Sequence, residues 1–83
     1  MPYELFTRVS LADDLPAKGL RRGDVATIVD THPGTNGQEP GYSLEVFNAI
    51  GETIAVLTVR ESQIEPLARD EILHVRHLDE MLV

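Results

Sequence analysis

The order of hydrophobic and polar residues along the chain predicts five short strands, over residues 5–11, 24–31, 42–48, 53–59 and 64–67. Residues 5–11 and 42–48 alternate between the two kinds of side chain, as strands with one buried face do. Residues 24–31 and 53–59 are rich in Val, Ile and Thr, which favour strands. Because Pro66 lacks a backbone N–H, we expect the last piece to lie at an edge of the sheet.

The segments between these strands carry residues that favour turns. Residues 12–23 contain Pro, two Gly and several charged side chains, and they predict a long exposed connection that Leu15 and Leu20 attach to the core. Residues 32–41 combine two Pro with three Gly and predict a second loop with a mobile tip. Residues 49–52 are a short turn containing Gly, so the strands on either side of it should form a hairpin.

Five short strands are too few for a sandwich of two sheets, but they suit a small barrel. We therefore predict an all-β fold, an SH3-like barrel over residues 1–67, with a tight helical turn at residues 61–63. Residues 68–83 form a C-terminal extension in which some hydrophobic positions fit a helical stripe and others fit a strand. We predict an extra strand over residues 72–78, with a short helix or a disordered tail as the alternatives.

Length and composition are those of one folded domain without covalent cross-links. The chain has 83 residues, of which 42% are hydrophobic and 25% are charged. Because it has no cysteine, neither a disulfide nor a thiolate metal site can support the fold. No run approaches the ~20 apolar residues of a transmembrane helix, and the first residues lack the pattern of a secretory signal. We therefore expect a cytoplasmic protein with no membrane partner.

Acidic side chains outnumber basic ones by 14 to 7, which gives the chain a formal net charge of −7. Such a surplus repels phosphate backbones and favours solubility or a basic partner. The acidic residues are spread over the later strands and turns and include Glu45 and Glu52, whereas the basic residues gather mostly in the first connection and the C-terminal extension. A basic partner is therefore expected to approach the side of the later strands.

Five short motifs follow one another along most of the chain: Tyr-Glu-Leu-Phe at 3–6, Asp-Leu-Pro at 14–16, Gly-Leu at 19–20, Gly-Asp-Val-Ala-Thr-Ile-Val at 23–29 and Ala-Val-Leu-Thr-Val at 55–59. In this order they resemble a family of small bacterial proteins catalogued as domain of unknown function 4926. The motif at 23–29 is the most specific, although members often have Gly where this chain has Ala26. The resemblance implies a compact β-barrel with no established catalytic residues. It also implies a partner protein encoded nearby, in an arrangement like that of toxins and antitoxins.

The sequence has no constellation of residues that predicts catalysis. Acidic pairs such as Asp13 and Asp14 stand in polar surroundings, whereas acid–base catalysis needs one carboxyl kept neutral in an apolar pocket. Neither a nucleophile elbow nor a complete phosphate-binding loop is found. His74 and His77 would share a helical face with Asp70, but on a strand the two histidines point to opposite faces, and no third ligand converges with them. We therefore predict no enzymatic activity, no metal site and no cofactor.

Lys18, Arg21 and Arg22 form a small basic cluster in the first connection. KOW-type and other SH3-like barrels, to which the Gly-Asp-x-x-x-x-Val pattern at residues 23–29 is weakly similar, sometimes use this position for contacts. Three cations would neutralise few phosphates, and affinity for nucleic acid rises with the number neutralised. The reading that we favour is that these charges solvate the loop and pair with Asp13, Asp14 or Asp24. Nucleic-acid binding is therefore the alternative function, and nucleic acid is an unlikely partner.

Recognition of another protein is the function that these exclusions favour. A small barrel cannot bury all of its apolar side chains, so its aromatic residues are candidates for an exposed patch, although each could equally belong to the core. Open strand edges can accept a strand from a partner, and the C-terminal extension could hold a homo-oligomer together. We predict a non-catalytic protein-binding module, the antitoxin-like or accessory half of a two-gene pair. Its predicted binding residues are Tyr3, Phe6, Tyr42, Glu45, Phe47 and Glu52.

Overall fold

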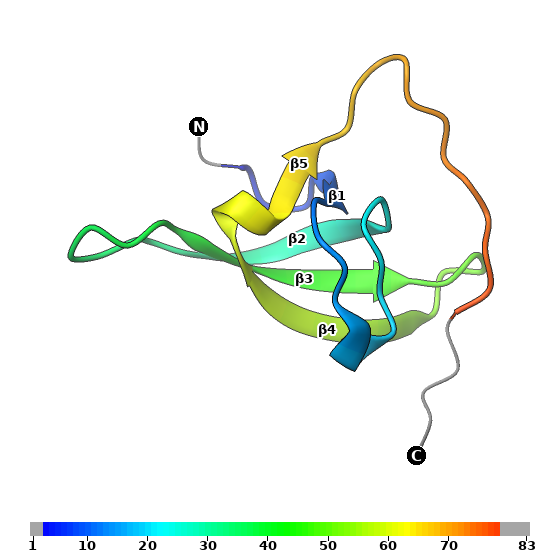
Figure 1. The fold of residues 1–83 in the computed structure, drawn as a ribbon, viewed down its shortest axis with the longest axis horizontal. Helices are drawn as coiled ribbons and strands as arrows, with labels where there is room; N and C mark the ends of the chain where they lie inside the picture. Colours follow the sequence, from blue (N-terminus) through cyan, green and yellow to red (C-terminus); the bar gives the residue numbers. More distant parts are fainter. Residues whose placement is uncertain (1–2, 79–83) are drawn as a thin grey trace.

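A single antiparallel sheet of five strands forms the fold (Figure 1). In the computed structural model, which describes residues 3–78, the elements are β1 (Arg8–Leu11), the 3-10 turn η1 (Pro16–Lys18), β2 (Val25–His32), β3 (Gly41–Phe47), β4 (Thr53–Arg60), the 3-10 turn η2 (Glu61–Gln63) and β5 (Ile64–Pro66). The predicted all-β class and the five strands are therefore confirmed, and the polar break at 61–63 forms a 3-10 turn.

The strands lie in the order β4-β3-β2-β1-β5, so the first strand is placed between the second and the last. Val9 of β1 pairs with Ala26 on one side and with Pro66 on the other. As its proline requires, β5 forms an edge of the sheet. No pairing joins β4 to β5 within residues 3–78, so the predicted barrel is not closed. The reason is that β5 has only three residues and its proline cannot donate a hydrogen bond to a further strand.

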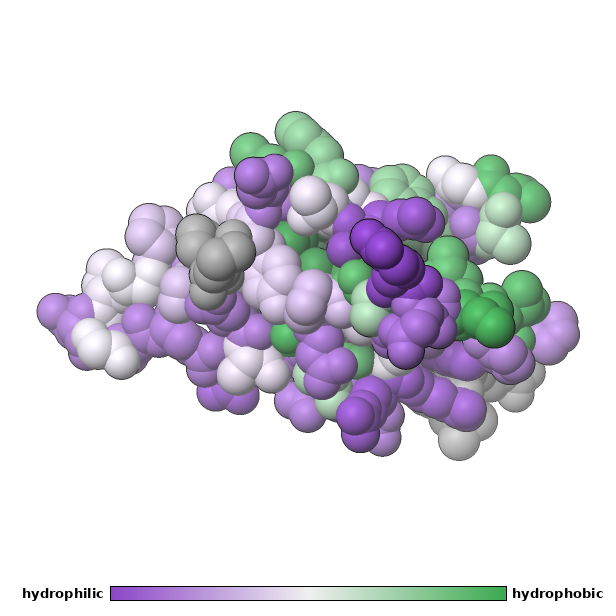
Figure 2. All heavy atoms as spheres, turned by 90° about the horizontal axis from the view of Figure 1, so that it is seen from above, coloured by the Kyte–Doolittle hydropathy of each residue, from purple (hydrophilic) through white to green (hydrophobic). Residues whose placement is uncertain are grey.

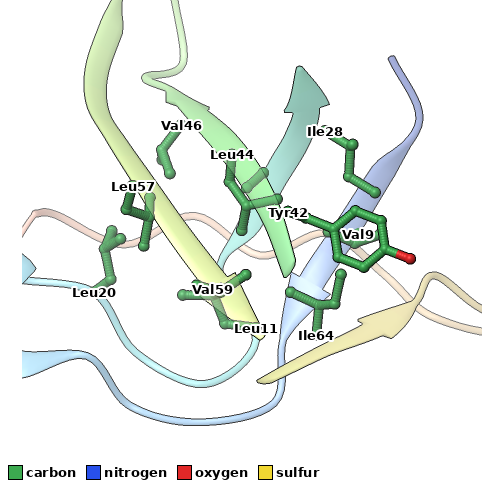
Figure 3. Close-up of a cluster of buried hydrophobic side chains, with 11 residues drawn as sticks. Val9, Leu11, Leu20, Ile28, Tyr42, Leu44, Val46, Leu57, Val59 and Ile64 are labelled. Carbon is green, nitrogen blue, oxygen red and sulfur yellow. The ribbon is translucent and has the colours of Figure 1, made fainter. Parts of the chain in front are cut away.

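The buried side chains form one cluster, around which the strands are arranged (Figure 3). Alternate residues of β2 and β3 point into it because successive side chains of a strand face opposite sides. Leu15 and Leu20 attach the first connection to this cluster, and the two residues exchange backbone hydrogen bonds of 2.9 and 3.1 Å. The long connection predicted over 12–23 therefore folds back onto the core.

Tyr42 belongs to this core and is only 1% exposed, so its predicted place in a surface patch is wrong. The alternation in β3 turns Tyr42 to the same side as Leu44. The ring of Tyr3 packs edge-on against it, at a centroid distance of 5.5 Å, and the Tyr3 backbone N–H donates to the Tyr42 hydroxyl at 3.1 Å. Burial, and then the negative charge of Glu61, raise the pKa of Tyr3.

The hydroxyl of Tyr42 is therefore expected to contribute to stability. Tyr42→Phe should lower the free energy of unfolding by about 1 kcal/mol, because the Tyr3 N–H loses its acceptor while the ring stays in place. Tyr3→Phe is the matched control, since the Tyr3 hydroxyl makes none of these contacts, and it should change stability by less than about 0.5 kcal/mol. Urea unfolding followed by circular dichroism measures both variants, and equal losses would contradict the assigned role.

The first strand is shorter than predicted because the chain bends at Phe6. Phe6 has a φ of 65°, in the left-handed region that bulky residues rarely adopt, and its N–H donates to Ile28 O at 2.6 Å. The alternation expected over residues 5–11 is therefore not observed: residues 5–8 are exposed, and Val9, Ser10 and Leu11 are all buried. Leu5 is exposed, and the Phe6 ring is 73% exposed.

The C-terminal segment, residues 67–78, contains neither a strand nor a helix, so the predicted strand over 72–78 is wrong. The Glu71 N–H donates to Ala68 O at 3.1 Å, and this turn follows shortly after the end of β5. The segment then runs past one end of the sheet, at the right of Figure 1. The remainder of the predicted extension, residues 79–83, lies outside the described residues, and the boundary between 67 and 68 stays a prediction.

Candidate protein-binding groove

A groove of about 820 Å³ separates the C-terminal segment from one end of the sheet. We call it the terminal groove. Its sheet-side wall includes Val25, Phe47 and Ile54, from the start of β2, the end of β3 and the start of β4, and its other wall includes Leu73 and Leu78. Figure 2 shows hydrophobic side chains gathered at this end of the molecule, on the right of the view.

The walls of the terminal groove expose large hydrophobic side chains to solvent. Phe47 is 43% exposed, although it ends a central strand, and Ile72 on the opposite wall is 92% exposed. Leu73, Val75 and Leu78 are exposed as well. Scattered single hydrophobic residues are normal on a protein surface, but a contiguous group marks an interaction site. The groove is therefore the candidate site of this domain.

An ion pair fixes the C-terminal segment to the body of the domain. The Arg76 Nε donates to Asp24 Oδ1 at 2.9 Å, and its Nη2 donates to Asp24 Oδ2 and to Gly19 O, the latter at 3.3 Å. Asp24 Oδ2 also accepts the Arg21 N–H at 2.7 Å. Such bidentate contacts between arginine and carboxylate add geometric specificity and energy to a single hydrogen bond. We call this contact the Asp24–Arg76 latch.

The charge of Asp24 is favoured by its surroundings. Partial burial acts to raise the pKa of its carboxyl, but the hydrogen bonds from Arg76 and from the Arg21 N–H, together with the charges of both arginines, hold the pKa below its ordinary value of 3.8. Asp24 therefore contributes stability that is present above pH 3.8 and is lost as the pH falls through the lower pKa of the folded state. The Asp24–Arg76 latch should therefore be formed at neutral pH and broken only in strong acid.

Removing the latch is expected to release the C-terminal segment. Arg76→Ala at neutral pH should make the amides of residues 72–78 mobile and cost about 1 kcal/mol of stability or less, because the pair is partly exposed. NMR relaxation of these amides measures the change. Arg69→Ala, an exposed arginine of the same segment, is the control and should leave them ordered. Similar relaxation in both variants would show that other contacts hold the segment.

The six residues predicted for protein binding do not form one surface. Of these, Phe47 lines the terminal groove. Glu45 accepts a hydrogen bond from Thr53 Oγ1 at 2.5 Å, and Glu52 accepts one from Asn48 Nδ2 at 2.8 Å. Glu45 and Glu52 therefore lie on the same β3–β4 hairpin as Phe47. The other three lie elsewhere: Tyr3 and Tyr42 at the core, and Phe6 before β1.

Sequence reasoning missed the second wall of the groove and its latch. Asp24 and Arg76 are 52 positions apart, and no local pattern indicates that they pair. In the sequence of the C-terminal segment, some hydrophobic positions fit the spacing of a helix and others fit that of a strand. An apolar segment that fits neither period is the signal that would have pointed to a strap lying across the domain.

The basic cluster of the first connection contains two carboxylates. The backbone N–H of Arg22 donates to Asp14 Oδ1 at 2.9 Å, just as that of Arg21 donates to Asp24. Lys18 ends η1 and is exposed. The negative charges of Asp14 and Asp24 lower the positive potential of the cluster, which weakens its attraction for phosphate.

Polar side chains elsewhere on the sheet form a cross-strand ladder. His32 Nε2 lies 2.8 Å from Ser43 Oγ, which lies 3.4 Å from Thr58 Oγ1. These residues are at least partly exposed on the outer face of the sheet. Within residues 3–78, no three His, Cys, Asp or Glu side chains come close enough together to hold a metal ion, His74 and His77 included. In the same part of the chain, no helix has the length and apolar character needed to cross a membrane.

Fold and groove together define a small all-β domain that presents an apolar cleft between its sheet and its C-terminal segment. The chain belongs to the family described as Domain of unknown function (DUF4926), whose model matches residues 5–66. This match confirms the resemblance seen in the sequence motifs. The matched residues contain all five strands and end before the segment that forms the outer wall of the groove. No curated protein and no solved structure is significantly similar to the chain.

Proposed function

We propose that this protein is a non-catalytic binding module that holds a hydrophobic and basic segment of another protein in the terminal groove. The proposal is carried by the exposed hydrophobic side chains that face the groove from both of its walls. Leaving such side chains in water is costly, and covering them with an apolar ligand is favourable. A partner segment would therefore gain most by placing its own apolar side chains between Phe47 and Leu73.

Charge supports a basic character for that segment. The domain carries a formal charge of −7, and the acidic side chains of Glu45 and Glu52 lie on the hairpin beside the groove. Glu71 lies on the wall formed by the C-terminal segment. Complementary charge mainly speeds association and selects the partner, whereas the apolar contacts hold the complex together. The family resemblance suggests a protein encoded next to this one, as in a two-gene pair, as the first partner to test.

The test measures the affinity of that neighbouring protein for the purified chain by isothermal titration calorimetry. Phe47→Asp and Val75→Asp, one on each wall, should each weaken binding about tenfold or more, because they place a charge against apolar surface. Ile50→Asp is the matched control, since Ile50 is an exposed residue of the same hairpin that does not line the groove. Equal losses in all three variants, or no binding by the unaltered chain, would refute the proposal.

Nucleic-acid binding through Lys18, Arg21 and Arg22 has less support, because the carboxylates of Asp24 and Asp14 accept hydrogen bonds from the backbone of Arg21 and Arg22 and add negative charge there. The binding-module proposal predicts no association with RNA or duplex DNA even at low salt, where electrostatic attraction is strongest. Fluorescence anisotropy during a salt titration measures this. Binding that disappears in a Lys18→Glu and Arg22→Glu double variant would favour the nucleic-acid function instead.

A further inference from the structure

The C-terminal segment, residues 67–78, is attached to the rest of the domain at two separate places. At its start it continues from β5, where Pro66 pairs with β1. Near its other end, Arg76 binds Asp24 and the carbonyl oxygen of Gly19. Between these two attachments the segment runs as an arc past one end of the sheet (Figure 1). The terminal groove lies between this arc and the sheet.

The arc between the two attachments packs loosely against the domain. The Ile72 side chain is 92% exposed and that of Val75 is 82% exposed. Among the described residues, no side chain of the C-terminal segment belongs to the core cluster or packs against it. In the same part of the chain, no backbone hydrogen bond joins residues 72–78 to a strand. Regions with so few buried contacts open locally at a small cost in free energy, so the segment can move while the strands stay paired.

The Asp24–Arg76 latch holds the far end of the C-terminal segment, and water can reach it. The Arg76 and Asp24 side chains are 25% and 19% exposed, and a pair that is open to water in this way shifts an equilibrium by about fivefold or less. Asp24 stands directly before β2 and also accepts the Arg21 N–H, so it stays with the sheet when the contact breaks. Arg76 is therefore the partner that moves away, and the C-terminal segment moves with it.

The two attachments restrict how another polypeptide can reach the terminal groove. While both attachments hold, a polypeptide that passes beneath the C-terminal segment has to be threaded there by a free end. A segment from the interior of a partner protein has no free end, so it enters only after one attachment is released. The attachment at β5 cannot be released without breaking the sheet, because β5 pairs with β1 and Ile64 is buried in the core. The latch is therefore the attachment that can open.

We propose that the C-terminal segment is a hinged strap that lifts at the Asp24–Arg76 latch to admit an interior segment of the partner protein, and that it closes over this segment when the latch forms again. The inference rests on the proposed function, because it concerns the same groove. Closing brings Leu73 and Val75 against the bound segment. Because the latch is formed both in the free domain and in the complex, it slows entry and release alike and has little effect on affinity.

Opening of the strap can be measured without any partner. The chain has no cysteine, so one introduced thiol reports on the groove. Ser10 lies on the sheet side of the groove and is 6% exposed. The thiol of Ser10→Cys should react with Ellman's reagent about fivefold faster when Arg76→Ala is added, because the open form is then more populated. Arg69→Ala removes the same charge from the same segment and should leave the rate unchanged. Equal rates with and without the Arg76 side chain would overturn the proposal.

Binding kinetics distinguish a moving strap from a fixed wall. In stopped-flow measurements with the protein encoded next to this one, Arg76→Ala should raise the association and the dissociation rate constants by a similar factor, about fivefold, with little change in Kd. Arg69→Ala is again the control and should change neither rate constant. Faster dissociation alone, with a correspondingly weaker Kd, would show that the C-terminal segment only forms a wall, and it would overturn the proposal.

A covalent closure of the latch gives the sharpest test. In the double variant of Asp24→Cys and Arg76→Cys, a short bismaleimide can join the two thiols and hold the C-terminal segment down. The joined form should no longer bind the neighbouring protein, whereas the same variant left unjoined should bind it. Undiminished binding by the joined form would show that the partner enters without lifting the strap, and it would overturn this inference alone. Absence of binding by every form, the unaltered chain included, would refute the proposed function itself.

Discussion

Replacing Leu44 by alanine is expected to lower the free energy of unfolding by about 3 kcal/mol. Leu44 is 0% exposed, and it pairs with Ile28 of β2 on one side and with Leu57 of β4 on the other. Three strands therefore pack around the space that the shortened side chain would leave. A domain of this length has roughly 4–12 kcal/mol of stability in total, so the variant should be close to unfolding at room temperature.

Ile50→Ala is the control for this loss. Ile50 lies in the β3–β4 turn and is exposed, so its truncation should change the free energy of unfolding by less than about 0.5 kcal/mol. Urea unfolding followed by far-ultraviolet circular dichroism measures both variants. Losses of similar size would mean that Leu44 is not at the centre of the core.

The second large effect is expected from Gly34→Ala, which should cost about 2 kcal/mol. A Cβ on Gly34 would lie 2.1 Å from the Gln38 carbonyl oxygen and 2.9 Å from the Glu39 carbonyl carbon. Both are backbone atoms, so no side-chain rotation relieves the clash and the loop has to change shape. Its far end is attached to η2, where the Ser62 N–H and Oγ donate to the Glu39 carboxylate at 2.7 and 3.0 Å. A reshaped loop would lose these bonds as well.

Gly37→Ala in the same loop separates this clash from ordinary backbone strain. Gly37 has a φ of +78°, but a Cβ there would meet nothing within 4 Å. Alanine should therefore cost only about 1 kcal/mol, the usual penalty for a left-handed conformation. Unfolding measurements compare the two variants, and the Ser62 amide resonance should shift in Gly34→Ala alone. A larger loss at position 37 would contradict the described loop.

The strands could be predicted from the sequence because their signals are local. Alternation over 42–48 places β3 to within one residue at either end, and the β-branched run over 53–59 does the same for β4. Pro66 predicts an edge position because its missing N–H is a property of the residue itself. The hairpin follows from the short turn between two such strands.

Other features depend on contacts that no local pattern encodes. The bend at Phe6 follows from a left-handed conformation that is rare for phenylalanine, so propensity predicts the opposite. Closure of the barrel depends on how far β5 extends. Whether an aromatic residue is exposed or buried depends on which face of its strand packs against the core. The terminal groove depends on the Asp24–Arg76 latch, which joins two distant parts of the chain. Of the six predicted binding residues, Phe47 lines the groove and the other five do not. Exposure inferred from the sequence does not show which residues share a surface.

The place of β1 between β2 and β5 has a consequence for the synthesis of the protein. As the chain emerges from the ribosome, β1 can pair with β2, β2 with β3, and β3 with β4. The edge of β1 that faces β5 stays unpaired until Pro66 has been synthesised. Leu11 finds its partner Ile64 only at that stage. Pairing over such a separation in sequence is slow compared with hairpin formation. The nascent domain therefore carries a central strand with one unpaired edge for most of its synthesis, and this is the interval in which it most needs protection from aggregation.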